Sequence, residues 1–530
     1  MEYAHYLPRD LVVSFLGLVF VSVVMRSLLM WQRRTRGKLL PPGPRHLPIL
    51  GYLNAPKFKP WFAFKEMSTR YGSDILYFRR FGQHNIVLSD PSVITEYLVK
   101  RTTNTSDRVH SPSVTLSTLN RRLAFMPYAA EWSDCRRAFW QHFHPGALGR
   151  YKHVQLAVAH RFLLKLLEKP AGFQQHIRYT FAATILKITY GIDIDDENAE
   201  IVQVVENAGK GPGQTLIPGR FLVDSIPFLR FVPAWMPGAG FQRQFAEWGA
   251  ASRKLKDFPY VRRNTAFTDN ALPSCATIAD TLLSEKGETG EYSSGIGQED
   301  LVKTVCGAAY VAGADTTYST LQAAFLALSL YPDVQRKAQA ELFAVVGPDR
   351  LPDFGDREAL VYVNALVKEM LRWFNVTPLG MAHRTMADDE LNGYFIPAGT
   401  MITPNIWACM HDPAEYEDAD EFRPERFIRD GKLDSTVRDP LAFAFGFGKR
   451  HGPPGDRICP GRYFADTALF INVASVLHVF DITPPLDENG NPIRVKMEMS
   501  DGFISYPEDC RCTIRPRSEK AAALILKTQG

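Results

Sequence analysis

The stretch that decides the fold is Arg457-Ile458-Cys459-Pro460-Gly461-Arg462-Tyr463-Phe464-Ala465, which follows the aromatic, glycine-rich segment Phe443-Ala444-Phe445-Gly446-Phe447-Gly448. Cys459 has basic neighbours and no second cysteine nearby, which argues against a zinc site or a disulfide. A thiolate is a strong, soft iron ligand, and the fixed charge of Arg457 suits the carboxylates of a haem. Gly461 would allow a tight turn beneath a flat macrocycle. The ordinary alternative is a buried, inert cysteine, but these neighbours favour a haem with Cys459 as its axial ligand.

This segment resembles the haem-binding loop of the cytochromes P450, the haem-thiolate monooxygenases, whose pattern is Phe-x-x-Gly-x-Arg-x-Cys-x-Gly. Counting back from Cys459, Arg457 matches the pattern, but a glycine stands at the Phe position. Without residues 451–457, Phe445 and Arg450 would complete the pattern. The resemblance therefore implies a seven-residue insertion, either a surface bulge rich in turn-forming residues or, as we favour, a translated intron remnant. It leaves open which of the two arginines faces the haem.

The size and composition of the chain predict one large body. The 530 residues are 45% hydrophobic, and no long polar linker divides them. The net charge of +4 is too small to indicate nucleic-acid binding. Seven widely spaced cysteines suit a reducing compartment. Together with the resemblance, this predicts a mainly helical domain with small sheets over residues 51–515, followed by a flexible tail at 516–530.

The N-terminal region reads as a membrane anchor. Residues 11–31 are apolar apart from small polar residues and Arg26, and about 20 such residues span a bilayer as a helix. Basic residues follow in the hinge at 32–50, which also contains a proline-rich stretch. This charge bias predicts a single-pass endoplasmic reticulum protein with residues 1–10 in the lumen and the body in the cytosol. A cleaved secretory signal is the alternative, but no positive start or small-x-small cleavage site is evident.

A second motif lies on a long predicted helix, Glu299 to Leu330, which Pro332 ends. It reads Ala312-Gly313-Ala314-Asp315-Thr316-Thr317, and its small residues would let a flat ligand approach at Gly313. Plain helix packing is the alternative. The string is similar to the oxygen-binding motif of the cytochromes P450. That resemblance implies that Thr316 steadies oxygen bound at the haem and that Asp315 relays protons.

Two further resemblances concern the scaffold and the haem propionates. In the family, a helical Glu-x-x-Arg interlocks with the Arg of a Pro-Glu-Arg-Phe motif. By that match, Glu369, Arg372 and Arg426 form a structural triad. The pair Trp132-x-x-x-Arg136 resembles the propionate-binding helix. His383 stands where related members bind a propionate, and its neighbour Arg384 is the alternative.

The remaining segments are placed by resemblance. We expect strands near 75–89 and 394–403 and a strand pair within 503–515. The apolar segment 218–240 resembles the loop between the roof helices, where membrane contact and core packing are equal alternatives. Pocket-lining candidates are residues 106–125, 377–382 and Phe503.

The resemblance implies a monooxygenase that inserts one atom of O₂ into an apolar organic substrate. Electrons would come from NADPH through NADPH–cytochrome P450 reductase, with cytochrome b5 as a second candidate donor. The motif sequences resemble those of basidiomycete enzymes of secondary metabolism. By analogy, this predicts a role in the tailoring of a terpenoid or polyketide. Two alternatives stay open. One is a haem-thiolate isomerase or dehydratase, against which Asp315 and Thr316 argue. The other is a haem protein inactivated by the insertion.

Overall fold

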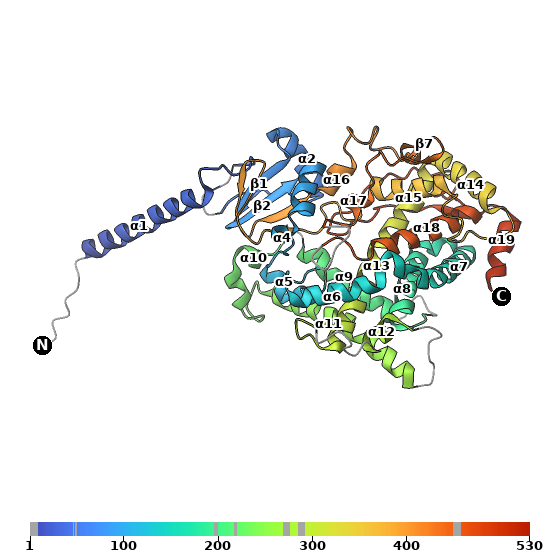
Figure 1. The fold of residues 1–530 in the computed structure, drawn as a ribbon, viewed down its shortest axis with the longest axis horizontal. Helices are drawn as coiled ribbons and strands as arrows, with labels where there is room; N and C mark the ends of the chain where they lie inside the picture. Colours follow the sequence, from blue (N-terminus) through green and yellow to red (C-terminus); the bar gives the residue numbers. More distant parts are fainter. Residues whose placement is uncertain are drawn as a thin grey trace.

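The computed structural model describes residues 9–45, 47, 50–194, 200–216, 220–268, 276–284, 292–448 and 457–529. Helix α1 (Arg9–Thr35) projects from a mainly helical body, and the strands β1 and β2 lie at the end of the body nearest to it (Figure 1). The long helices of the body are α2 (Pro60–Tyr71), α6 (Ala130–Phe143), α7 (Lys152–Glu168), α8 (Phe173–Tyr190), α9 (Glu200–Thr215), α11 (Gly240–Thr268), α13 (Gln298–Leu330), α14 (Pro332–Val346), α15 (Val361–Trp373) and α18 (Arg462–Val479).

Shorter helices connect these elements. They are α3 (Pro91–Ile94), α4 (Thr102–Thr105), α5 (Pro112–Leu116), α10 (Leu222–Ser225), α12 (Ile278–Ser284), α16 (Ile406–Met410), α17 (Leu441–Ala444) and α19 (Glu519–Leu526), with 3-10 turns that include η5 (Pro227–Phe231) and η6 (Pro424–Phe427).

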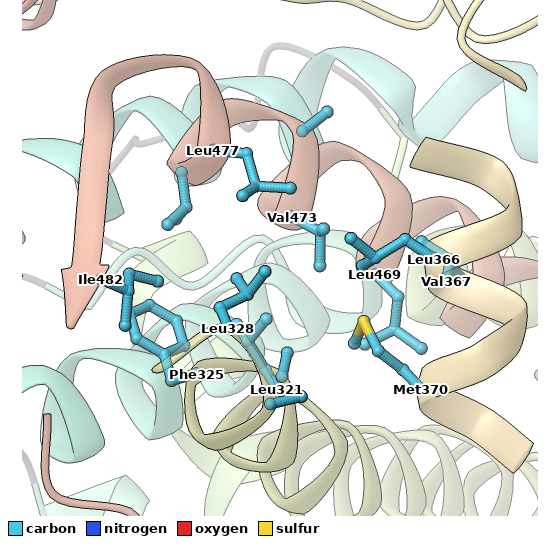
Figure 2. Packing of buried hydrophobic residues seen from close by; sticks show 14 of the residues in the cluster. Leu321, Phe325, Leu328, Leu366, Val367, Met370, Leu469, Val473, Leu477 and Ile482 are labelled. Atoms are coloured by element: carbon cyan, nitrogen blue, oxygen red, sulfur yellow. The ribbon is translucent and has the colours of Figure 1, made fainter. Parts of the chain in front are cut away.

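The largest hydrophobic core lies where α13, α15 and α18 meet. Leu321 and Phe325 of α13 face Met370 of α15 and Leu469 and Val473 of α18, and all five side chains are buried (Figure 2). Helix α13 is buried on nearly all sides in its second half, which explains its continuous run of apolar and small residues there. The predicted helix from Glu299 to Leu330 is confirmed to within one residue.

The main sheet has the strand order β1-β2-β6-β3. Its strands are β1 (Ile75–Arg80), β2 (Gln83–Leu88), β3 (His383–Arg384) and β6 (Met401–Pro404), and β2 and β6 run parallel. Phe81 and Gly82 join β1 to β2 with positive φ values of 43° and 83°, as a two-residue hairpin turn with the right twist requires. Two-stranded sheets form from β4 (Asp389–Leu391) with β5 (Tyr394–Ile396), β7 (Ile428–Arg429) with β8 (Lys432–Leu433), and β9 (Phe480–Thr483) with β10 (Thr513–Pro516).

The expected mainly helical fold with small sheets is confirmed, whereas the C-terminal region differs from our expectation. Strand β10 pairs with β9 rather than with a second strand inside 503–515. Residues 516–530 were expected to be a flexible tail, but helix α19 forms there. The side chain of Ser518 caps α19 by accepting a hydrogen bond from Ala521 N–H. Ile525 is fully buried in the main core, which gives this segment a reason to pack.

Helix α1 is linked to the body by ion pairs. Arg34 makes two hydrogen bonds to the carboxylate of Asp388, at 2.6 and 2.5 Å, and Lys38 pairs with Glu390. No helix among the described residues combines the length and the apolar character needed to cross a membrane.

The segment between α9 and α11 presents aromatic side chains to the surface. Phe228, Phe231 and Trp235 are 81%, 67% and 79% exposed. Core packing is therefore excluded for these three side chains. Pro218 and Gly219, at the start of the predicted apolar segment, lie outside the described residues.

Candidate active site

A cavity of about 1210 Å³ lies inside the body. It exceeds the roughly 300–1,000 Å³ of ordinary small-molecule pockets. Its walls include the predicted site residues Trp132, Arg136, Gly313, Asp315, Thr316, His383, Phe445, Arg457, Cys459 and Gly461. The structure thus brings together, in one cavity, residues that are more than 300 positions apart in the chain.

The loop that carries Cys459 is closed by a backbone hydrogen bond. Cys459 N–H donates to the Phe445 carbonyl over 2.7 Å, and Gly446 adopts a φ of 75° that favours glycine. Burial raises the pKa of the Cys459 thiol, and the Gly461 N–H and the charges of Arg136 and Arg462 lower it in part. These donors and cations favour the thiolate, which is the ligand form.

Gly461 has a different role from the predicted one. Its φ of −88° is open to any residue, so no tight turn requires glycine there. Its backbone N–H instead points to the Cys459 sulfur. Nothing in the protein lies within 4 Å of the place that a Cβ would occupy. The correction is that this glycine supplies an N–H group and free space, and the loop reverses at Gly446.

The structure describes only the last residue of the predicted insertion, Arg457. Arg450 and residues 451–456 lie outside the described residues. Arg457 reaches the cavity wall, where its guanidinium carbon lies 4.1 Å from the ring centre of Trp132. Gly446, which precedes the residues that are not described, lies close to the Arg457 carbonyl. Gly446 and Arg457 are therefore neighbours at the cavity wall.

Three buried arginines gather at this part of the cavity. Arg457 donates to the carbonyls of Ser106 and Met126 at 2.8 and 2.7 Å. Arg108 donates to backbone carbonyls in residues 124 and 381–382 at 2.9 to 3.0 Å. Arg136 donates to the Ile458 carbonyl.

Among the described residues, Arg108 and Arg457 form no ion pair with a carboxylate. Burial lowers the pKa of Arg457 to about 8, and repulsion from Arg108 and Arg136 adds to this. Burial likewise lowers the pKa of Arg108 to about 9. Asp107 opposes both shifts, but it already pairs with Arg384 at 3.0 Å. A guanidinium does not lose its proton in proteins, so these shifts indicate that the cluster needs an anion.

His383 lies in β3 beside this cluster. Its Nδ1 is 2.8 Å from the Thr105 carbonyl and donates to it, which leaves Nε2 for a further partner. Burial and the charge of Arg108 hold the pKa of His383 well below its usual value, so the ring is neutral and Nε2 accepts. Donation from His383 to a propionate would therefore require protonation of the ring. Arg384, the alternative, is engaged by Asp107.

The residues present fit a haem. The cavity combines the Cys459 thiol, whose pKa the Gly461 N–H and two arginines lower in part against the effect of burial, with Arg108 and Arg457, which pair with no carboxylate among the described residues. The Nη1 atom of Arg457 is buried and has no hydrogen-bond partner in the described part of the chain. Haem carries two propionate groups, and charge-assisted bonds to carboxylates are what such guanidinium groups make best.

Helix α13 supplies the polar residues of the cavity. The Thr316 hydroxyl donates to the Ala312 carbonyl over 2.6 Å. Burial raises the pKa of Asp315, although a hydrogen bond from Tyr506 and the charge of Arg178 lower it in part. Arg178 in turn pairs with Glu206 at 3.2 Å, and that carboxylate is 43% exposed. Asp315 is thus connected to the surface by charged groups.

Gly313 mainly serves helix packing. A Cβ at this position would lie 3.0 Å from Ile185 of α8, so the missing side chain lets α8 and α13 approach each other. Gly313 also lines the cavity. Gly313 therefore fits both interpretations of the small-residue string, helix packing and a place at the wall of the ligand cavity.

The residues of the predicted triad lie in one cluster behind the cavity. Arg372 donates to both carboxylate oxygens of Glu369 at 2.7 and 2.8 Å, and Arg426 donates to the same carboxylate at 3.1 Å. Backbone carbonyls, including Met410 and Ala419, accept the other N–H groups of Arg372. Glu369 and Arg372 are fully buried.

Sequence reasoning missed three residues of this site. Arg108 fell inside the predicted pocket-lining stretch, but no spacing marks it as part of a cation cluster. Tyr506 and Arg178 approach Asp315 from segments far away in the sequence. Only the tertiary structure brings such residues together, so a single sequence carries no signal for them.

The sequence matches the family model for cytochrome P450 over residues 41–507. It is 38% identical to cytochrome P450 monooxygenase COX1 of Coprinopsis cinerea, over 98% of this chain and 99% of that protein. It is 35% identical to tryptamine 4-monooxygenase of Psilocybe cyanescens, over 95% of this chain and 98% of that protein. The chain therefore belongs to the cytochrome P450 family. It is a haem-thiolate monooxygenase, and its cofactor is haem b with a cysteine thiolate as axial ligand.

Proposed function

We propose that the protein inserts one atom of O₂ into an apolar organic substrate in the cavity, with Cys459 as the axial ligand of the haem. The observation that carries this proposal is the meeting of Cys459, the Asp315–Thr316 pair and the buried arginines Arg108, Arg136 and Arg457 in one cavity. The same pair disfavours an isomerase or a dehydratase, which would have no use for a proton relay to bound oxygen.

Different residues of the cavity would have different roles in this reaction. When bound, the thiolate-ligated haem supplies oxygen activation. Arg108, Arg136 and Arg457 would bind and orient its propionates. The Thr316 hydroxyl would hold a proton at the cavity wall, and the Asp315 carboxyl would replace that proton, while the charge of Arg178 steadies the carboxylate form of Asp315. The raised pKa of Asp315 suits this role, because a carboxyl that is easily protonated can both accept and release a proton.

The substrate class and the electron source belong to the same proposal. Beside its charged and polar residues, the cavity wall includes apolar residues such as Phe125, Val311, Val376 and Phe503. The relatives are fungal monooxygenases, and one of them is named for hydroxylating activity on tryptamine. We therefore propose tailoring of a terpenoid or polyketide of fungal secondary metabolism, with electrons from NADPH through NADPH–cytochrome P450 reductase.

Membrane attachment is also part of the proposal. Residues 11–31 of α1 include Phe15, Leu18 and Leu28, whose side chains are 66%, 68% and 55% exposed. Water does not stabilise such a surface, whereas a lipid bilayer does. The exposed aromatic residues near η5 suggest a second contact. We propose attachment to the endoplasmic reticulum with the body in the cytosol.

The function is tested by expressing the full chain with the reductase in microsomes that are supplied with candidate scaffolds. Metabolite profiling should show an oxygenated product that requires both NADPH and O₂. The reduced protein should give the carbon monoxide difference spectrum of a thiolate ligand, and Cys459→His should lose it. Cys512→Ser is the matched control, because it removes a thiol outside the cavity. Conversion of the substrate without O₂ would contradict the proposal.

The inactive-protein alternative needs its own test. Deletion of residues 451–457 would place Arg450 two positions before the cysteine. We expect the full-length chain to give the thiolate spectrum already, because the loop around Cys459 is closed by its own hydrogen bond. A spectrum that appears only after the deletion would show that the insertion inactivates the site.

A further inference from the structure

Arg122 is a partly buried cation of the cavity that the predicted propionate site does not include. Its Nη2 atom donates to the Ala208 carbonyl of α9 at 2.9 Å and to the Ser252 hydroxyl of α11 at 2.6 Å. Its Nε and Nη1 atoms are shielded from solvent and have no hydrogen-bond partner among the residues that the structure describes. The side chain lines the cavity.

Arg122 is separate from the arginines that fit the propionates. The loop that carries Arg122 also lies beside the other two arginines, because its carbonyls at Ala124 and Met126 accept hydrogen bonds from Arg108 and Arg457. Arg122 instead reaches to α9 and α11. The pKa of Arg122 is lowered to about 10 by burial alone, with no contribution from either of those two arginines or from a carboxylate. Arg122 is therefore electrostatically separate from the two arginines that fit the propionates.

The rest of this part of the cavity is also cationic. Arg121, Lys210 and Arg220 line it and are exposed. The acids that line the cavity have other partners. Glu206 pairs with Arg178, Asp315 accepts from Tyr506, and Asp501 accepts from the Lys59 backbone N–H. Shielded guanidinium nitrogens without a partner are unfavourable, and a wall on which cations outnumber acids among the described lining residues attracts an anion.

We propose that Arg122 forms a binding site for a carboxylate on the substrate. The substrate is then amphiphilic, with an apolar skeleton near the haem and an acid group at the wall between α9 and α11. This inference rests on the proposed function, and it narrows the substrate class from apolar compounds to carboxylic acids.

The test measures binding rather than turnover. The full-length, haem-loaded protein is titrated by calorimetry with straight-chain fatty carboxylates from octanoate to hexadecanoate and with the matching alcohols, at mildly alkaline pH. A hydrogen bond to a charged group contributes enough to make the best carboxylate bind about 10- to 100-fold more tightly than its alcohol. Arg122→Gln should remove this preference and leave the affinity for the alcohol unchanged. Arg122→Lys should keep part of it.

Ser252→Ala is the matched control. It removes a contact that fixes Arg122 between α9 and α11 but leaves the charge in place, so the preference should remain. The proposal is overturned if no carboxylate binds, if carboxylate and alcohol bind equally, or if Arg122→Gln weakens both alike, since that last result indicates a purely structural clamp. Loss of monooxygenase activity would instead show as the absence of an oxygenated product, whatever the binding preference.

Discussion

Two clusters of buried arginine differ in how their charge is balanced. Behind the cavity, Arg372 and Arg426 share the carboxylate of Glu369, and backbone carbonyls accept their remaining N–H groups. On the cavity wall, the partners of Arg108 and Arg457 among the described residues are backbone carbonyls, and Asp107, the carboxylate near them, pairs with Arg384.

The difference separates scaffold from binding site. A buried ion pair with all its hydrogen bonds made is complete, and it becomes strongly unfavourable only when one partner is removed. A buried cation without an anion is incomplete until a ligand supplies the charge. The first cluster can therefore form as the chain folds, whereas we propose that the haem completes the second.

The largest effect is expected from breaking the complete cluster. Glu369→Ala or Arg372→Ala leaves a buried charge without its partner, which should destabilise the protein by about 3–5 kcal/mol and abolish haem incorporation. Haem content per protein and thermal unfolding measure both effects. Lys337→Ala is the control, because its pair with Glu425 is exposed. Normal haem content in both variants would refute the structural role of Glu369 and Arg372.

A smaller effect is expected when the ligand of the incomplete cluster is altered. A haem whose propionates are esterified can no longer neutralise Arg108, Arg136 and Arg457. Each lost charge-assisted bond should weaken haem binding by about tenfold or more. Reconstitution of haem-free protein with haem and with its dimethyl ester measures the ratio of affinities. Equal affinities would mean that the cluster does not bind the propionates.

Removing one member of the incomplete cluster should have a smaller effect again. Arg457→Gln deletes the charge but keeps an amide that can donate to Ser106 or Met126. Because repulsion from Arg108 is relieved, we expect the stability of the haem-free protein to change by less than about 1 kcal/mol. Haem transfer to apomyoglobin should become about tenfold faster. If the haem-free variant were instead as unstable as Glu369→Ala, the two clusters would be of the same kind.

The comparison also explains what the sequence could predict. Cys459, the Asp315–Thr316 pair and the Glu369–Arg372 spacing lie within short segments, so their order in the chain identifies them. Arg108 could not be predicted in this way, because a tertiary contact with Arg457 gives it its environment.

Two incorrect expectations have the same origin. We expected Gly461 to allow a tight turn. The identity of a residue does not fix its backbone angles, and the positive φ of this loop lies at Gly446 instead. The tail at 516–530 was expected to be flexible because it matches no family motif. Its apolar residues at 524–525 nevertheless pack against the main core, and only burial reveals this.

The smallest effect is expected from a pair that is complete but exposed. Arg34 and Asp388 are 42% and 35% exposed, and they make two good hydrogen bonds between α1 and the body. Solvent screening limits such a pair to about 0.2–1 kcal/mol. Arg34→Gln should therefore lower the unfolding free energy by no more than this amount, the difference should shrink at high salt, and haem content should stay normal. Arg33→Gln, one position earlier, controls for the loss of charge alone. If Arg34→Gln lowered the unfolding free energy as much as Glu369→Ala does, the presence of an ion pair alone would determine the loss of stability. Burial would then not explain why the Glu369 cluster matters more than a surface pair.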